Sequence, residues 1–153
     1  HGHFDHIMGV DLFNQKYNCD LYIFEDDLPF AKDSNLNQSF SILHKEYYVN
    51  APLIALKDRQ IITLGKTKIE VMHTPGHTTG SCCYLINDAL FTGDTLFAGS
   101  IGRTDFPTGS YEQIINSLRL IKNRYQTTDI KVYPGHGCAT TIQVELQNNI
   151  YFR

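Results

Sequence analysis

Residues 71–77 read Val71-Met-His-Thr-Pro-Gly-His77, an apolar strand that runs into a turn carrying a histidine. The same arrangement recurs at Leu90-Phe-Thr-Gly-Asp94 and at Val132-Tyr-Pro-Gly-His136. Each segment has Gly, or Pro and Gly, where its strand ends, and each carries a possible metal ligand in the turn. Turns at strand ends hold side chains rigidly while leaving them open to substrate, so the three turns predict one site at a sheet edge.

Strands and helices are interleaved around these turns, which predicts a mixed α/β fold. Apolar spacing predicts a helix within residues 7–17 and a second one over residues 110–125, where Ser110 and Gln113 fit a capping box. Residues 25–60 are polar and irregular and predict a long connection with short helical turns. Strands are expected at residues 20–24, 60–64, 67–72, 81–86, 89–92 and 130–133, and a last helix is expected to start at Thr140 or Thr141.

The composition is that of an ordinary globular chain. Its 153 residues suit one domain over residues 1–153, with 42% hydrophobic residues and a net charge of −3. No basic patch favours nucleic acid, and no apolar run approaches the roughly 18 residues of a membrane span. The four cysteines show no C-x-x-C spacing, so we expect reduced thiols in a cytoplasmic protein. Cys138 is expected to be a buried, inert thiol. The composition does not select an oligomeric state.

The first six residues, His1-Gly-His3-Phe-Asp5-His6, contain four potential metal ligands. Two imidazoles two residues apart point the same way from an extended segment, and Asp5 and His6 follow on the turn into a helix. This density suits a site with two metal ions. His77, Asp94 and His136 supply the remaining ligands, and Asp94 is the natural shared one because a carboxylate has two oxygens. A lone histidine such as His136 is by itself more often a surface or core residue, and His73 is expected to pack within its loop.

Four motifs together resemble the metallo-β-lactamase superfamily of hydrolases. They are His1-x-His3-x-Asp5-His6, His73-Thr-Pro-Gly-His77-Thr, Phe91-Thr-Gly-Asp94 and Pro134-Gly-His136-Gly. Residues 93–107 are similar to the glyoxalase II-like group of hydroxyacylglutathione hydrolases and their short relatives without a C-terminal helical domain. The resemblance implies a four-layer αββα sandwich with the site at the edge between the two sheets.

The resemblance also implies where the metal ions bind. One ion is expected on His1, His3 and His77, and a second on Asp5, His6 and His136, with Asp94 and a hydroxide bridging them. The chain opens directly on a ligand, whereas the family has strands before this motif, so we expect the domain to be N-terminally incomplete. Full-size glyoxalase II enzymes also have a C-terminal helical domain that helps to bind glutathione, and we expect this sequence to lack it.

The implied activity is metal-dependent hydrolysis of a small-molecule thioester such as S-lactoylglutathione, with Asp5 and Asp94 as the catalytic carboxylates. Attack by the bridging hydroxide would be assisted by metal charge on the carbonyl oxygen. Nitrogen and oxygen ligands favour two zinc ions and leave iron or manganese open. Arg103 is a candidate for binding an anionic substrate, although an Arg103–Asp105 ion pair that pins the loop is the favoured interpretation.

A second reaction class uses the same residues. Persulfide dioxygenases look similar to this chain, and there a single iron would be held by His3 or a neighbour, His77 and Asp94. The stretch Phe106-Pro-Thr-Gly109 favours the hydrolases. A common zinc β-lactamase is disfavoured, because those enzymes have Cys where Asp94 stands. A non-catalytic metal-binding protein explains poorly why open, glycine-rich turns gather seven ligands.

Overall fold

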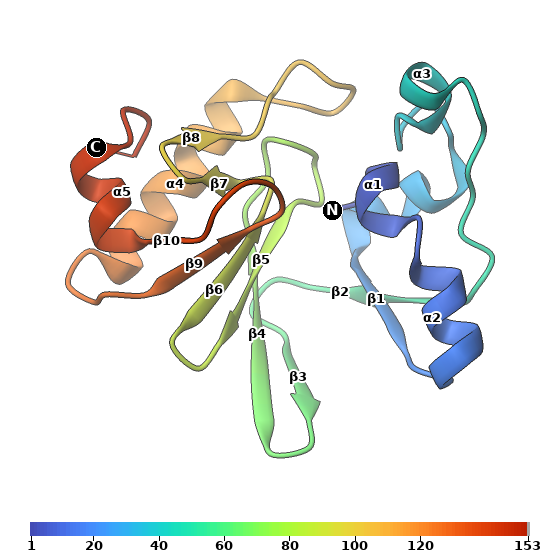
Figure 1. Ribbon diagram of the computed structural model, residues 1–153, viewed down its shortest axis with the longest axis horizontal. Helices are drawn as coiled ribbons and strands as arrows, with labels where there is room; N and C mark the ends of the chain where they lie inside the picture. The colour runs from blue at the N-terminus through green and yellow to red at the C-terminus, as the bar shows by residue number, and fades with distance from the viewer. Residues whose placement is uncertain (153) are drawn as a thin grey trace. The chain divides into compact units, whose positions relative to one another are not determined.

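The computed structural model describes residues 1–152, which divide into two compact units. Unit 1 comprises residues 1–56 and unit 2 begins at Lys57. Each unit contains both helices and strands, as the sequence predicted. One domain over residues 1–153 stays a prediction, and the units are described separately below (Figure 1).

Unit 1 is built from short elements around a small core. Its strands β1 and β2 pair in parallel, with Leu21 opposite Leu53. The helix expected within residues 7–17 forms over Val10–Tyr17, and a separate helical turn over Phe4–Ile7 precedes it. Residues 25–60 contain helical turns as expected, but also the unexpected strand β2. Ile7, Ala31 and Val49 form the buried core. The elements are α1 (Phe4–Ile7), α2 (Val10–Tyr17), β1 (Leu21–Phe24), the 3-10 helix η1 (Glu25–Lys32), α3 (Ser39–Leu43) and β2 (Leu53–Leu56).

Unit 2 is organised by a six-stranded sheet with the strand order β10-β9-β6-β5-β4-β3. All neighbouring pairs are antiparallel except β6 and β9, which are parallel. Both hairpins that the sequence predicted, around Gly65-Lys66 and Asn87-Asp88, are present (Figure 1). The strands are β3 (Ile61–Leu64), β4 (Thr67–His73), β5 (Cys82–Ile86), β6 (Ala89–Gly93), β7 (Leu96–Phe97), β8 (Ser100–Ile101), β9 (Lys131–Pro134) and β10 (Thr140–Thr141).

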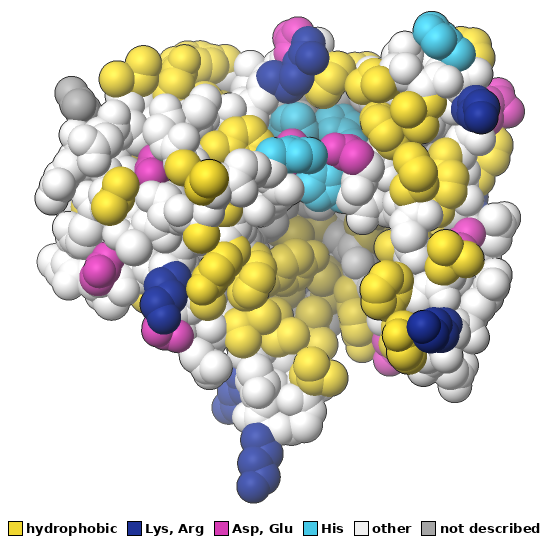
Figure 2. All heavy atoms as spheres, in the orientation of Figure 1, with side chains coloured by type: hydrophobic (Ala, Val, Ile, Leu, Met, Phe, Trp, Pro, Cys, Tyr) yellow, Lys and Arg dark blue, Asp and Glu magenta, His cyan; other side chains and the backbone are white. Residues whose placement is uncertain are grey.

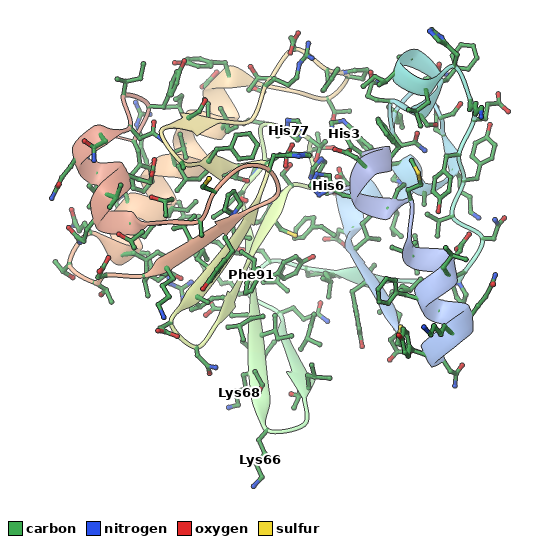
Figure 3. The ribbon with its side chains drawn as sticks, viewed as in Figure 1. His3, His6, Lys66, Lys68, His77 and Phe91 are labelled. Atoms are coloured by element: carbon green, nitrogen blue, oxygen red, sulfur yellow. The ribbon has the colours of Figure 1, made fainter. Side chains whose placement is uncertain are left out.

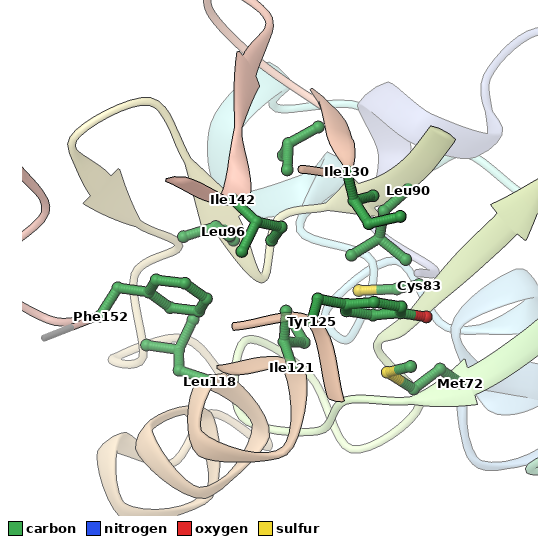
Figure 4. Close-up of a cluster of buried hydrophobic side chains, with 11 residues drawn as sticks. Met72, Cys83, Leu90, Leu96, Leu118, Ile121, Tyr125, Ile130, Ile142 and Phe152 are labelled. Carbon is green, nitrogen blue, oxygen red and sulfur yellow. The ribbon is translucent and has the colours of Figure 1, made fainter. Parts of the chain in front are cut away.

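The helix α4 (Tyr111–Tyr125) covers one face of this sheet. Ser110 caps it by accepting a hydrogen bond from the Gln113 backbone N–H at 3.3 Å, as the capping box predicted. The predicted apolar stripe of α4 is buried against strand residues that alternate along the sheet, because successive strand side chains point to opposite faces. Figure 4 shows this core, which includes Met72, Cys83, Leu90, Leu118, Ile121, Tyr125, Ile130 and Ile142.

The last helix, α5 (Ile142–Asn148), is tied to the β7–β8 hairpin by a buried carboxylate. Glu145 is 1% exposed and accepts hydrogen bonds from Thr140 Oγ1, the Gly99 backbone N–H and Asn149 Nδ2 at 2.7, 2.9 and 2.8 Å. A buried carboxylate is tolerated only when it is satisfied in this way. The contact fixes the segment that follows Asp94.

All four cysteines are free thiols, and burial raises the pKa of Cys83 to about 12. The expectation that Cys138 is buried was wrong, because the connection between β9 and β10 runs over the surface. Lys and Arg side chains lie scattered on the face that Figure 2 shows. Within residues 1–152, every helix is too short or too polar to cross a bilayer.

Candidate metal centre

Strand pairing brings the three predicted turns of unit 2 to one edge of the sheet. Strand β4 is antiparallel to β5, which is antiparallel to β6, so β4 and β6 run in the same direction. Strand β9 is parallel to β6, with Gly93 opposite Pro134. The carboxyl ends of β4, β6 and β9 therefore share an edge. His77, Asp94 and His136 follow these three ends (Figure 3 labels His77).

One carboxylate oxygen faces both histidines of this group. Asp94 Oδ2 lies 3.4 Å from His77 Nε2 and 3.6 Å from His136 Nε2. His77 is 3% and Asp94 8% exposed, whereas His136 lies at the surface. Ligand atoms that share a tetrahedral zinc ion at about 2.0–2.1 Å are roughly 3.3 Å apart. The separations therefore match donors around a common cation.

The tautomer of His77 adds to this fit. Its Nδ1 lies 2.7 Å from the Arg103 carbonyl oxygen, which can only accept, so Nδ1 carries the proton. In the neutral ring, Nε2 then presents a lone pair toward the carboxylate of Asp94. Two such electron-rich atoms at 3.4 Å are stabilised by a cation between them. Metal-bound histidines usually have their other ring nitrogen held by a carbonyl or carboxylate in this way.

A glycine lets the His77 turn lie directly against α4. Gly76 has φ +137°, and a Cβ there would be 2.2 Å from the Ile114 backbone nitrogen. The Ser110 N–H donates to the Gly76 carbonyl at 2.8 Å, and Ser117 Oγ donates to the Pro75 carbonyl at 2.7 Å. His73 bonds the Thr79 carbonyl oxygen through Nε2 at 2.8 Å, which agrees with its expected role in loop packing.

The loop of residues 102–109 lies against the same histidine. A Cβ on Gly102 would be 1.8 Å from the Asp94 carbonyl oxygen and 3.2 Å from His77 Nδ1, so only glycine fits. Arg103 donates to both oxygens of Asp105, from Nε at 2.6 Å and from Nη2 at 2.5 Å. These hydrogen bonds lower the pKa of Asp105 to about 2. The favoured interpretation of an ion pair is confirmed, and substrate binding by Arg103 stays a prediction.

Unit 1 holds a second group of potential ligands. His1 Nε2 lies 3.0 Å from His3 Nδ1, and the rings of His1 and His6 have centroids 4.1 Å apart. Asp5 Oδ2 lies 3.7 Å from His6 Nε2. His3 is extended and precedes α1, as the spacing predicted (Figure 3 labels His3 and His6). The structure thus brings these four residues together within unit 1.

A buried aspartate supports this second group. The Gly2 N–H donates to Asp27 Oδ2 at 2.8 Å, and Asp27 is fully buried. A Cβ on Gly2 would be 2.5 Å from Phe30 Cβ, so glycine allows the close approach to η1. Sequence reasoning missed Asp27, which stands in the acidic run 25–27 with no feature that distinguishes it from its neighbours.

Residues 1–136 match a family model described as Metallo-beta-lactamase superfamily. The chain is 31% identical to "Probable polyketide biosynthesis zinc-dependent hydrolase PksB" of Bacillus subtilis (strain 168), across all of this chain and 63% of that protein. It is 34% identical to "Hydroxyacylglutathione hydrolase GloC" of Haemophilus influenzae, across 97% of this chain and 71% of that protein. The chain thus spans 63% of the length of PksB and likewise of a second hydrolase, BaeB of Bacillus velezensis.

Two solved structures share the fold over nearly the whole chain. BLEG-1 B3 metallo-beta-lactamase superposes with a TM-score of 0.90 at 32% identity, covering 99% of this chain and 74% of that one. TTHA1623, solved in a di-iron-bound form, gives a TM-score of 0.81 at 27% identity with the same coverage of both chains.

Proposed function

Because the chain belongs to the metallo-beta-lactamase superfamily, we propose that it is a metal-dependent hydrolase of small-molecule thioesters. The observation that carries the proposal is the Asp94 carboxylate, which faces the Nε2 atoms of His77 and His136. The likeness to the hydroxyacylglutathione hydrolase GloC supports a substrate such as S-lactoylglutathione.

Seven side chains are proposed to hold two divalent ions. The ligands are His1, His3 and His77 for one ion and Asp5, His6 and His136 for the other, with Asp94 shared. Their nitrogen and oxygen donors suit zinc and iron, and carboxylates also suit manganese. Zinc is the first choice, supported by a relative whose name includes zinc dependence, and a neighbour solved with two iron ions keeps iron as the alternative.

Divalent cations held by these residues would lower the pKa of water toward about 7 and would polarise a carbonyl group. The proposal gives Asp94 the role of accepting a hydrogen bond from the attacking water and orienting it, with Asp5 as the second carboxylate. The water oxygen adds to the thioester carbonyl carbon and the C–S bond then breaks, which yields a carboxylic acid and a thiol. A thiolate, with a conjugate pKa of about 8.5, leaves without prior protonation.

Replacement of the shared carboxylate tests the proposal most directly. Asp94→Ala should abolish nearly all thioester turnover and remove most of one metal equivalent, because both histidines lose the oxygen that they face. The measurements are hydrolysis of S-lactoylglutathione and elemental analysis of the purified protein. Asp88→Ala is the matched control, because Asp88 is an exposed carboxylate in the turn between β5 and β6. Full activity with two metals retained in Asp94→Ala would rule out the scheme.

Dioxygenase chemistry with one iron is the second candidate. His77 and Asp94 are adjacent, and we propose His3 as the third member of the two-histidine, one-carboxylate set that iron oxygenases use. Oxygen uptake with glutathione persulfide, measured beside S-lactoylglutathione hydrolysis and metal content, separates the two reactions. A chromogenic cephalosporin belongs in the same assay, since BLEG-1 is called a B3 metallo-beta-lactamase. Hydrolysis of the thioester with two metal ions supports the first candidate, and oxygen uptake with one iron supports the second.

A further inference from the structure

The loop of residues 102–109 contacts His77 at two places. The Arg103 carbonyl accepts the Nδ1 proton at 2.7 Å, and the Phe106 ring meets the imidazole nearly edge-on, with centroids 6.3 Å apart. We infer that Arg103 and Asp105 are positioning residues that hold this loop so that His77 presents Nε2 to a divalent cation. The inference rests on the proposed function insofar as His77 is a metal ligand.

The side chains of the loop form one continuous stack. The Arg103 guanidinium carbon lies 3.9 Å from the centroid of the Phe106 ring, while its Nε and Nη2 donate to Asp105. A planar guanidinium can stack on a ring while two of its N–H groups bind a carboxylate, whereas an ammonium lacks this planar two-donor geometry. The order Asp105, Arg103, Phe106, His77 therefore links a surface ion pair to a buried imidazole.

Both ends of the loop are fixed by other contacts. Gly102 lies directly against the Asp94 backbone, and at the other end the Ser110 N–H donates to the Gly76 carbonyl at 2.8 Å. Thr108 Oγ1 also accepts from the Thr79 N–H at 3.3 Å. The Arg103 carbonyl follows the fixed end at Gly102 directly, and the Arg103 side chain, with its ion pair and its ring contact, holds the direction of that carbonyl. Removing contacts that support a metal-bound histidine typically lowers the metal affinity 10–100-fold.

Substrate binding is the rival role for Arg103, whose side chain is 57% exposed. A positioning residue acts on His77 whether or not substrate is present. A substrate contact instead changes KM and leaves His77 and the metal unaffected. The two roles are therefore separated by measuring the imidazole and the metal directly.

The test uses Arg103→Ala and Asp105→Ala in the full chain. Zinc affinity, measured by competition with a chromophoric chelator, should fall about tenfold in each variant, and the double variant should be no weaker than either single one. Arg103→Lys should behave like Arg103→Ala, because lysine keeps the positive charge but cannot donate two parallel N–H groups to Asp105. Arg124→Ala is the matched control: Arg124 binds Glu70 through two contacts of 2.7 Å on the surface of the same unit, and its loss should leave zinc affinity within twofold.

The second readout is the ¹⁵N–¹H signal of His77 Nδ1 by NMR in the metal-free protein. It should be protected from exchange in the parent chain and should broaden or disappear in Arg103→Ala and Asp105→Ala. Unchanged zinc affinity and an unchanged signal in both variants would overturn the inference, as would a rise in KM alone. If His77→Ala leaves zinc affinity intact, the proposed ligand role fails instead, and the NMR signal still decides whether the loop positions the ring.

Discussion

The two groups of candidate ligands are built in different ways. In unit 1 the four side chains lie within residues 1–6, on an extended segment and one helical turn, and the buried Asp27 holds the segment at Gly2. In unit 2 the three side chains are spread over residues 77–136 and meet because β4, β6 and β9 end at one edge of a sheet. Local conformation makes the first group, whereas a sheet over an apolar core makes the second.

The comparison predicts that polar substitutions damage unit 1 more than unit 2. Asn37 is fully buried and donates from Nδ2 to the carbonyls of Phe30 and Tyr47, both at 2.9 Å, while its Oδ1 accepts from the Ser39 N–H at 3.0 Å. Asn37→Ala should lower the free energy of unfolding by about 3 kcal/mol, because two buried backbone groups and one partly buried one lose their partner. Urea denaturation measures this, with the exposed Asn35→Ala as control. A loss below about 1 kcal/mol would show that unit 1 does not depend on its polar network.

The next largest effect tests how closely the edge of the unit 2 sheet is packed. Gly102→Ala places a methyl group 1.8 Å from the Asp94 carbonyl oxygen, which is backbone and cannot rotate away. We expect a loss of about 2–3 kcal/mol in the free energy of unfolding, because the two segments must separate. Gly99→Ala is the control for a nearby loop glycine: it has open space at Cβ and loses stability only through its φ of +72°. Equal losses in the two variants would mean that conformational freedom, not close approach, requires Gly102.

The contrast between local conformation and long-range pairing also explains which elements could be predicted from the sequence. The helix at residues 110–125 and the two hairpins are encoded by neighbouring residues: the Ser110 cap, Gly65-Lys66 and Asn87-Asp88. Strand β2 was missed, because it pairs in parallel with β1 across residues 25–52 and nothing near Leu53 marks the partner. The ligand residue types were visible in the sequence, and their strand-end positions predicted that His77, Asp94 and His136 meet.

The supports of those ligands were not visible. His77 is held by the carbonyl of Arg103, which every residue possesses, so residue type carries no signal. Asp27 and Glu145 are buried carboxylates whose partners include the backbone N–H groups of Gly2 and Gly99. Such contacts depend on where distant loops lie, and only the folded chain identifies them.

The smallest expected effect concerns the Tyr125 hydroxyl, which lies at the apolar core of unit 2. Tyr125 is 5% exposed, and within residues 1–152 no group hydrogen-bonds its Oη. Burial is the main reason that the pKa of Tyr125 is raised. Removing an unsatisfied buried hydroxyl relieves a desolvation cost without leaving a partner unbonded. Tyr125→Phe should therefore leave the free energy of unfolding unchanged or raise it by up to about 1 kcal/mol, measured by urea denaturation against Tyr111→Phe, an exposed tyrosine of the same helix. A loss of more than about 1 kcal/mol would mean that the hydroxyl is satisfied in solution, and that the sheet of unit 2 also relies on polar contacts inside its core.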